Sequence, residues 1–418
     1  MVTIRKNCLA WVWVLVLVVG CIWPKSVPAE QTNIFREPSD SALSQEVENG
    51  LSYLLELVQK KEAAFDPARI VALIDFTAQG GSDARKLLPA ERTSGYGACL
   101  RADIKAPLER ILRYAYNPRI PSYVVYPRVI RLSGWYPGSD LVTRDVKLWK
   151  KLTTIDKPLL LWGKEYEVNT PDAFSGAYYR YDLNRLIILM KHNNKKVLVT
   201  VSKMPAPSGV GKKAVIIDDD NWNYFYSGIK GLTLKLLGPM ETYIQDSASV
   251  QIMYETDSVR PRTRMMLFKW LKAGWGNLNL VRHRHIYEGG LRFVKGLKET
   301  MESNSLPDPD VLVQGVKYIT ALPEAKIDAK IRKYSHNFER IAQKHQDMSP
   351  QEFVHIIEGG GYGKALNREE RLGVLTLEYF KSQLGKTALV EFHFRPLSEN
   401  IIAKPGKDVV LSGASDSL

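Results

Sequence analysis

Residues 185–202, RLIILMKHNNKKVLVTVS, decide the fold. The run 185–191 is apolar on both faces and rich in strand formers, which is typical of a central strand. In the run 196–202, valine alternates with Leu, Thr and Ser, so one face of this strand is expected to be wetter. Asn193-Asn194 between the runs suits a tight primed turn, because Asn tolerates a positive φ. The stretch therefore predicts a β-hairpin.

Short apolar runs on both sides of the hairpin extend it into a sheet. The connections between them are short, and this favours antiparallel pairing, because a parallel pair needs a crossover of about a dozen residues or more. We predict an antiparallel meander of roughly five to seven strands. The further strands are expected at 176–181, 213–217, 222–226, 243–244, 249–254 and 263–268.

A long helix is expected at 282–303, after the last of these strands. Its apolar residues recur at close to helical spacing, and charged residues lie between them. The predicted fold class is α+β, an antiparallel sheet packed with helices, plus a C-terminal helical domain. Such a sheet can grip the helix around an apolar cavity, or it can pack on the helix as a plain two-layer core.

Residues 1–29 have the pattern of an export signal. Arg5 and Lys6 precede an apolar stretch at 9–23, which is short for a membrane span. The small residues before Glu30 predict cleavage after Ala29, and a lipoprotein-like box predicts lipidation at Cys21 as the alternative. An uncleaved anchor is the third reading. We expect an exported protein, either periplasmic or a membrane-anchored lipoprotein.

Composition limits the partners. Of 418 residues with a formal charge of +13, cleavage after Ala29 leaves 389 residues and +10, because three basic residues and no acidic ones depart. It also leaves Cys99 as the one cysteine, so a core and not a disulfide must hold the fold. Acidic partners in an envelope are phospholipids, lipopolysaccharide or anionic glycans, and no nucleic acid is expected. Scattered basic residues also fit a plain soluble surface.

The rest of the chain divides into segments around the sheet. We expect a helical segment at 30–95, the sheet domain at 96–304, a C-terminal helical domain at 308–395 and a loose tail at 396–418. Further strands are predicted at 123–126, 129–132 and 159–162, and further helices at 41–58, 68–76, 107–116 and 368–384.

Several motifs suggest chemistry, but each lacks a required part. The glycine-rich 359–365 has no Ser or Thr after its Lys, and the Ser-x-x-Lys string at 227–230 sits among turn glycines. His283 and His285 have no third ligand at a telling spacing. Cys99 matches no hydrolase signature and is expected to be a buried, unreactive thiol. We therefore predict no catalytic residue, no metal and no cofactor.

Aromatic and basic residues gather in the sheet region. Aromatic residues on a pleated surface usually build a core, but they also line ligand cavities or stack on glycans. Basic residues in or after that stretch could hold an anionic group at a cavity mouth: Arg262, Arg264, Lys269, Lys272, Arg282 and Arg284. The predicted ligand-binding residues are Trp222, Tyr224, Tyr226, Tyr254, Arg264, Trp270 and Arg282.

The leading hypothesis is an exported, non-enzymatic binding protein. It would hold an amphipathic or anionic envelope component, such as a lipid or glycan, between the sheet and helix 282–303, and a space filled by side chains would refute it. The second hypothesis is an interaction or assembly protein that docks a protein partner through its C-terminal helices, which an exposed apolar patch on 368–384 would favour. The third is an envelope hydrolase that uses Cys99 or a carboxylate pair in a cleft.

Overall fold

The computed structural model describes residues 41–393, apart from positions 62, 80–86, 93–94, 235–237, 257–258, 261, 277, 346–347, 349–352 and 355–356. The predicted export signal, Cys21 and the predicted tail lie outside the described residues. The chain divides into two units by its internal contacts, residues 1–40 and residues 41–418. The finer boundaries predicted within that unit, at 95/96 and 304/308, stay predictions.

Seven antiparallel strands form the main sheet, in the order β3-β14-β13-β8-β7-β5-β4. The predicted α+β fold class is confirmed. Neighbouring strands follow one another along the chain except at one edge, where the first strand, β3, pairs with the last, β14. The bounds are β3 Tyr96–Ile104, β4 Ile130–Trp135, β5 Leu159–Asn169, β7 Arg180–His192, β8 Lys195–Lys203, β13 Tyr243–Glu255 and β14 Thr263–Gly274.

The predicted hairpin is confirmed as β7 and β8. Asn193 and Asn194 adopt φ values of 50° and 59°, the left-handed region that the tight turn requires. The turn sets a register in which Ile188 pairs with Val199. Because side chains alternate between the two faces of a strand, this register decides which side chains face each layer of helices.

The chain leaves the main sheet between β8 and β13. The strands predicted at 213–217 and 222–226 are present as β9 (Lys212–Asp218) and β10 (Asn223–Lys230), but they form a separate sheet with β6 (Ala177–Tyr178). A further pair, β11 (Leu232–Leu234) and β12 (Gly238–Met240), follows. Local alternation predicts a strand, whereas the choice of sheet depends on distant contacts that the alternation does not encode.

One predicted strand is wrong. Residues 123–126 were expected to extend the sheet, but Ser122–Val125 form the short helix α5. All four of its residues are buried, and a short apolar run that is buried all round has no periodicity to separate a helical turn from a strand. The neighbouring predictions at 129–132 and 159–162 correspond to β4 and β5.

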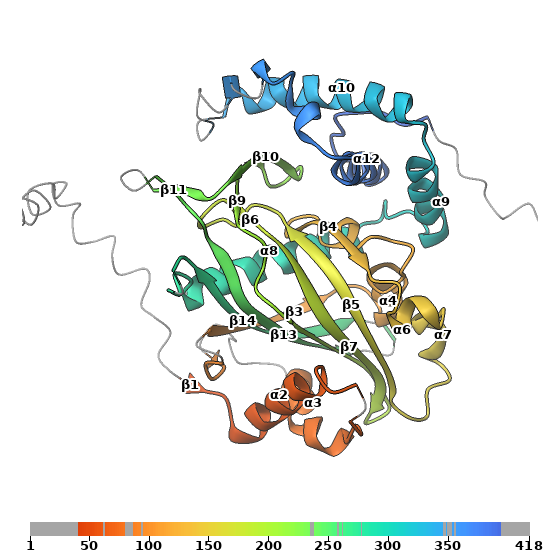
Figure 1. Ribbon diagram of the computed structural model, residues 1–418. Coiled ribbons are helices and arrows are strands. Elements are labelled where there is room, and N and C mark those ends of the chain that lie inside the picture. The colour runs from red at the N-terminus through yellow and green to blue at the C-terminus, as the bar shows by residue number, and fades with distance from the viewer. Residues whose placement is uncertain are drawn as a thin grey trace, which may run out of the picture. The chain divides into compact units, whose positions relative to one another are not determined.

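One face of the main sheet is covered by α2 (Gln45–Leu57) and α3 (Val71–Ala78), joined through the 3-10 turn η2 (Pro67–Ile70) (Figure 1). The Asp66 side chain caps this turn by accepting a hydrogen bond from the backbone N–H of Ala68 at 2.9 Å. The strand side chains beneath these helices are apolar and buried. A short pair, β1 (Ser41–Ala42) and β2 (Leu87–Leu88), lies beside this layer.

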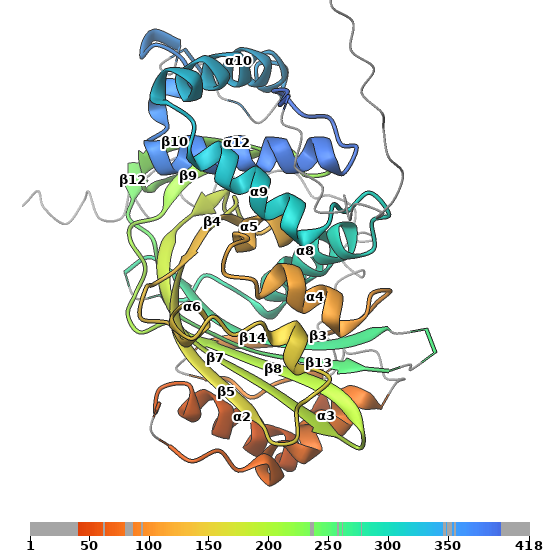
Figure 2. The same cartoon turned by 90° about the vertical axis from the view of Figure 1, so that its right-hand side faces the viewer.

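The other face curves around α8 (His283–Met301), as Figure 2 shows, with α4 (Leu108–Ala115) and α5 nearby. The predicted helix at 282–303 is confirmed, and Ile286, Val294, Leu297 and Met301 are buried. Two single-turn helices, α6 (Asp140–Thr143) and α7 (Leu148–Lys151), lie in the β4–β5 connection. The sheet therefore separates two helical layers.

Three C-terminal helices follow: α9 (Pro309–Thr320), α10 (Glu324–Ala342) and α12 (Arg368–Gln383), with the 3-10 turn η4 (Tyr362–Ala365) before α12. α10 and α12 lie beside the second sheet, and α9 packs against α12 (Figure 1). In the capping box of α12, Asn367 accepts from the Glu370 N–H at 3.0 Å and Glu370 accepts from the Asn367 N–H at 2.9 Å. Among the described residues, no helix is both long enough and apolar enough to cross a membrane.

Candidate ligand cavity

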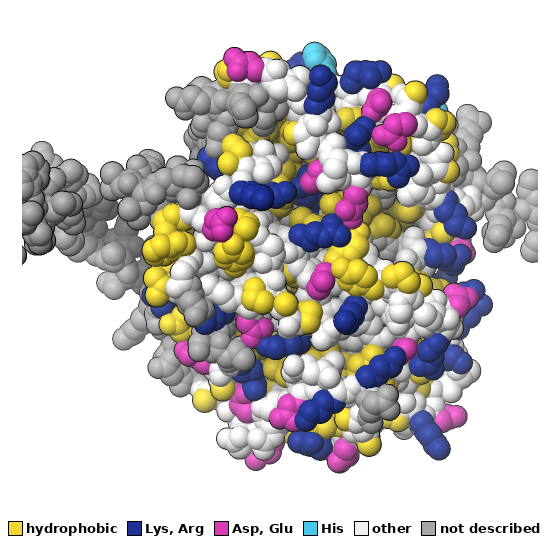
Figure 3. Space-filling model, viewed as in Figure 1, with side chains coloured by type: hydrophobic (Ala, Val, Ile, Leu, Met, Phe, Trp, Pro, Cys, Tyr) yellow, Lys and Arg dark blue, Asp and Glu magenta, His cyan; other side chains and the backbone are white. Residues whose placement is uncertain are grey.

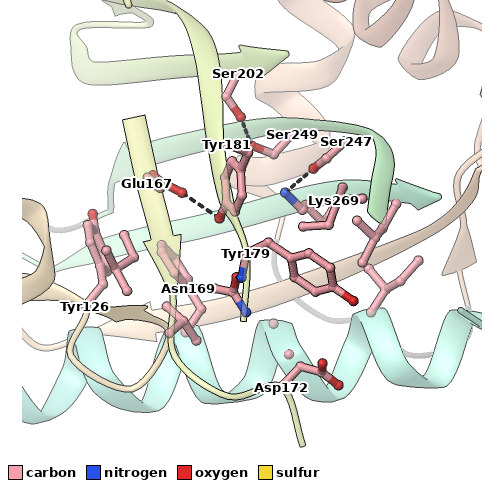
Figure 4. Close-up of a pocket in the computed structure, with 18 of the residues that line it drawn as sticks. Tyr126, Glu167, Asn169, Asp172, Tyr179, Tyr181, Ser202, Ser247, Ser249 and Lys269 are labelled. Carbon is pink, nitrogen blue, oxygen red and sulfur yellow. Dashed lines mark hydrogen bonds between the residues drawn. The ribbon is translucent and has the colours of Figure 1, made fainter. Parts of the chain in front are cut away.

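A cavity of about 360 Å³ lies between the main sheet and α8. Strands β5, β7, β8, β13 and β14 supply one wall, and α8 with the residues at the end of α4 and around α5 supplies the other. Figure 4 shows several of its polar side chains at close quarters. The volume falls in the range of about 300–1,000 Å³ that is typical of small-molecule sites.

A row of polar side chains crosses the sheet wall of the cavity. Arg185 on β7 pairs with Ser202 on β8, Ser202 pairs with Ser249 on β13, and Ser249 pairs with Lys269 on β14. Directly paired residues point to the same face, so all four side chains line the cavity. The hydroxyls of Ser202 and Ser249 share a hydrogen bond of 2.7 Å (Figure 4).

Two buried carboxylates on β5 lie at one end of this row. The Arg185 guanidinium donates to Glu165 at 2.9 Å and to Glu167 at 2.6 Å. Ser122 donates to the other oxygen of Glu165 at 2.8 Å, and Tyr181 donates to the other oxygen of Glu167 at 2.9 Å. Burial raises the pKa of Glu165, and Arg185 opposes that rise. Every carboxylate oxygen of the pair thus has a donor within the protein.

Lys269 lies at the other end of the row. Its ammonium donates to the Ser247 hydroxyl at 2.7 Å (Figure 4), and it forms no ion pair with any carboxylate of the described residues. Burial lowers its pKa from 10.5 to about 8. The nearby charge of Glu167 acts against this lowering, and the charge of Arg185 adds to it. An ammonium has three donors, so this group can still donate to a ligand in the cavity.

The cavity becomes apolar toward the N-terminal end of α8. Phe174, in the β5–β6 connection, stacks on His285 with ring centroids 3.9 Å apart and an interplanar angle of 22°. Both rings line the cavity. The apolar lining at this end consists of Ile244, Leu271, Leu280, Val281 and Ile286. A polar row and an apolar end in one cavity suit an amphipathic molecule.

Three of the seven predicted ligand-binding residues lie together, in and just before β10, and outside the cavity. Trp222 stacks on Phe380 of α12, with centroids 6.2 Å apart. The Tyr224 hydroxyl donates to Asp219 at 2.8 Å. The guanidinium of Arg131 lies 3.6 Å from the ring centre of Tyr226. These three aromatic residues therefore contact α12, the β9–β10 turn and β4, and they pack the second sheet against its neighbours.

Tyr254 and Trp270 lie on the sheet face that α2 and α3 cover. Tyr254 packs against the apolar cluster there. Trp270 is buried, and its indole N–H donates to the carbonyl of Ala90 at 2.8 Å. Trp270 follows Lys269 directly in β14, so the two side chains point to opposite faces.

The last two predicted residues are arginines, one near the start of β14 and one directly before α8. Arg264 pairs with Asp103 at 2.8 Å. Arg282 is exposed at the start of α8 and donates to the Tyr96 hydroxyl at 2.9 Å. None of the seven predicted residues lines the cavity. Two of them are direct neighbours of lining residues in the chain: Trp270 lies between Lys269 and Leu271, and Arg282 follows Val281.

The thiol and histidine motifs lie apart from the polar row. Cys99 is buried on the face under α2 and α3 and donates to the Leu87 carbonyl at 3.0 Å. Burial raises its pKa to about 12, so it is protonated at neutral pH. His283 contacts the carbonyl of Gly97. In the part of the chain that the structure describes, no group of three or more His, Cys, Asp or Glu could hold a metal ion.

Sequence reasoning missed most of the cavity residues. It named Lys269 only as one of six basic residues, and it did not single out Glu165, Glu167 or Arg185. A usable signal was present in β13, where the polar residues Ser247, Ser249 and Gln251 alternate with apolar ones. This is the wetter-face pattern that was recognised in the hairpin. Two neighbouring strands with that pattern indicate a polar patch inside the fold.

A scan against protein-family models finds no match for this chain. A search of curated proteins finds none either.

Proposed function

We propose that this chain is an exported, non-enzymatic binding protein that holds an amphipathic, anionic small molecule between the main sheet and α8. The observation that supports it most is Lys269, a buried ammonium whose partner is a hydroxyl. A buried charge is costly unless an opposite charge compensates it. An anionic head group in the cavity supplies that charge. Export, to the periplasm or as a lipoprotein, rests on the signal predicted at 1–29.

The residues that line the cavity favour one orientation of the ligand. Its anionic head lies against Lys269 and accepts one further hydrogen bond from whichever of the Ser202 and Ser249 hydroxyls does not donate to the other; both line the cavity. Its apolar part extends along Leu271 and Ile286 toward the start of α8. A lipid-like molecule fits this division better than a glycan does, because the lining has a polar row on the sheet and an apolar end toward the start of α8.

The two other hypotheses have less support. An assembly surface was expected to show as an exposed apolar patch on the last helix, but no large hydrophobic side chain of α12 is exposed. For a hydrolase, Glu165 does line the cavity with a raised pKa. However, Arg185 and Ser122 occupy both of its oxygens, and Cys99 lies on the other side of the sheet.

Fluorescence titration with cis-parinaric acid, a long-chain fatty acid, tests this function. The wild-type chain is expected to bind one equivalent, and Lys269→Met is expected to bind about tenfold or more weakly, because a charge-assisted hydrogen bond is lost. Lys269→Arg should retain binding. Lys272→Met, on the same strand but outside the cavity, is the matched control. The neutral methyl ester should not discriminate between wild type and Lys269→Met. Equal affinity of the free acid for both proteins would contradict the proposal.

A further inference from the structure

Four exposed apolar side chains lie in two connections that also supply residues to the cavity lining. Phe174 is 57% exposed, Trp275 45%, Leu278 57% and Leu280 48%. Phe174 belongs to the connection between β5 and β6, and the other three belong to the connection between β14 and α8. We call these four residues the rim patch. Exposed apolar groups that cluster in this way mark interaction surfaces more often than single exposed residues do.

The rim patch is continuous with the cavity. Phe174 and Leu280 themselves line it. Phe174 stacks on His285, whose Nδ1 accepts a hydrogen bond from the backbone N–H of Arg282 at 3.2 Å. The backbone N–H of Leu278 donates to the Trp275 carbonyl at 2.8 Å, which holds both residues in one turn. A surface that covers the rim patch would therefore also cover the mouth.

The charges beside the rim patch are mainly basic. Arg282 and Arg284 are exposed in the first turn of α8, and Lys272 is half-buried at the end of β14. Glu288 is the exposed acidic residue of the cavity lining nearby. Asp172 is held within its own loop, where it accepts from the backbone N–H of Phe174 at 3.0 Å. Figure 3 shows hydrophobic side chains with basic ones among them on the left of this face, around the start of α8.

We infer that the rim patch docks on the surface of an anionic lipid bilayer, so that the cavity opens toward the lipid. Trp and Leu side chains favour the boundary between head groups and acyl chains, and neighbouring arginines favour anionic head groups. A second copy of the chain is a poorer occupant, because a two-fold contact would bring Arg282 and Arg284 of both copies together. Exchange of a ligand at this surface rests on the proposed function, whereas the docking itself does not.

Flotation with lipid vesicles tests this inference on the full chain. Vesicles of phosphatidylcholine alone are compared with vesicles that also contain phosphatidylglycerol. The variants are Trp275→Ser with Leu278→Ser, and Arg282→Gln with Arg284→Gln. The matched control is Val71→Ser with Val142→Ser, which removes two exposed apolar side chains from α3 and α6. Circular dichroism establishes that each variant is folded.

The wild type and the control are expected to float with the phosphatidylglycerol vesicles, and added salt should weaken this binding. Each rim variant should bind at least about tenfold more weakly, a loss of about 1.4 kcal/mol or more. Lys269→Met, which alters only the cavity, should float like the wild type, so failure of the ligand site is distinguishable from failure of docking. Wild-type protein that stays with the buffer, self-association through the rim patch in place of flotation, or rim variants that float fully would overturn the inference.

Discussion

The two faces of the main sheet differ although they share the same strands. Toward α2 and α3, one row of paired residues is apolar and buried: Leu186, Val201, Val250 and Phe268. One residue away along each strand, the row toward α8 is Arg185, Ser202, Ser249 and Lys269. The backbone hydrogen bonds serve both rows equally. The difference therefore lies in what each face is packed against.

This difference assigns the stability of the fold to one face of the sheet and ligand binding to the other. The apolar row removes hydrocarbon from water, at about 25 cal/mol per Å² of buried surface, and its helices fill the space above it. The polar row has a cavity above it, and its hydroxyl groups bond to each other or to a neighbouring charge. A fold that needed only a core has no use for an ammonium at this position. The comparison predicts that substitutions on the first face change stability and those on the second change ligand binding.

The largest effect is expected on the apolar face. Phe268→Ala should lower the free energy of unfolding by about 3–5 kcal/mol, because it opens a void in a packed core. Ser249→Ala, one strand away on the cavity face, should cost about 1 kcal/mol. Urea unfolding of both variants makes the comparison. A cost for Ser249→Ala as large as that for Phe268→Ala would show that both faces are core.

A medium effect of opposite sign is expected at Lys269. Removing its buried charge in Lys269→Met should raise the free energy of unfolding by about 2 kcal/mol at neutral pH. The pKa of Lys269 in the folded chain, about 8, lies below its ordinary value of 10.5. The unfolded chain therefore binds more protons between these values, and the stability of the wild type rises with pH across that window.

Urea unfolding of wild type and Lys269→Met over a range of pH checks this expectation. The advantage of Lys269→Met should be complete below about pH 8 and should shrink toward pH 10.5. Lys272→Met, on the same strand but outside the cavity, is the matched control. A pH-independent difference, or a destabilised Lys269→Met, would mean that this ammonium carries no unfavourable burial.

The smallest effect is expected from predicted residues that lie outside the cavity. Tyr254→Phe and Arg264→Gln should leave the affinity for cis-parinaric acid within about twofold of the wild type, since less than about 0.5 kcal/mol is at stake. Fluorescence titration beside Lys269→Met makes the measurement. A loss as large as that of Lys269→Met in either variant would move the binding site to the α2–α3 side of the sheet.

Strand β14 shows which features of the fold the sequence predicts and which it does not. The sequence predicted a strand at 263–268, and the structure extends it to Gly274, so Lys269 and Trp270 lie on opposite faces of β14. The local sequence did not say which face would be the dry core. The prediction chose Trp270, because aromatic residues are common in ligand sites, and the structure places this residue under the α2–α3 layer. That choice depends on β3 and α2, which lie more than a hundred residues away in the chain.

Local signals served better where the structure itself is local. The two asparagines predicted the β7–β8 turn, and Asn367 with Glu370 predicted the start of α12. The valine alternation in β8 also indicated the face on which Thr200 and Ser202 now line the cavity. By contrast, the pairing of Arg185 with two glutamates on β5 requires the register of β7 against β5, strands that the sequence does not pair. The rim patch requires two connections that meet only in the folded chain.

Native mass spectrometry of the protein, purified without detergent from a bacterial envelope, tests the central claim most directly. The account predicts a stoichiometric small-molecule adduct on the wild type that disappears on denaturation and is absent from Lys269→Met. It also predicts that the released molecule is an amphipathic acid. A bare wild-type chain that takes up no added cis-parinaric acid, or an adduct that persists unchanged on Lys269→Met, would contradict the claim that the cavity face of the sheet is a binding site.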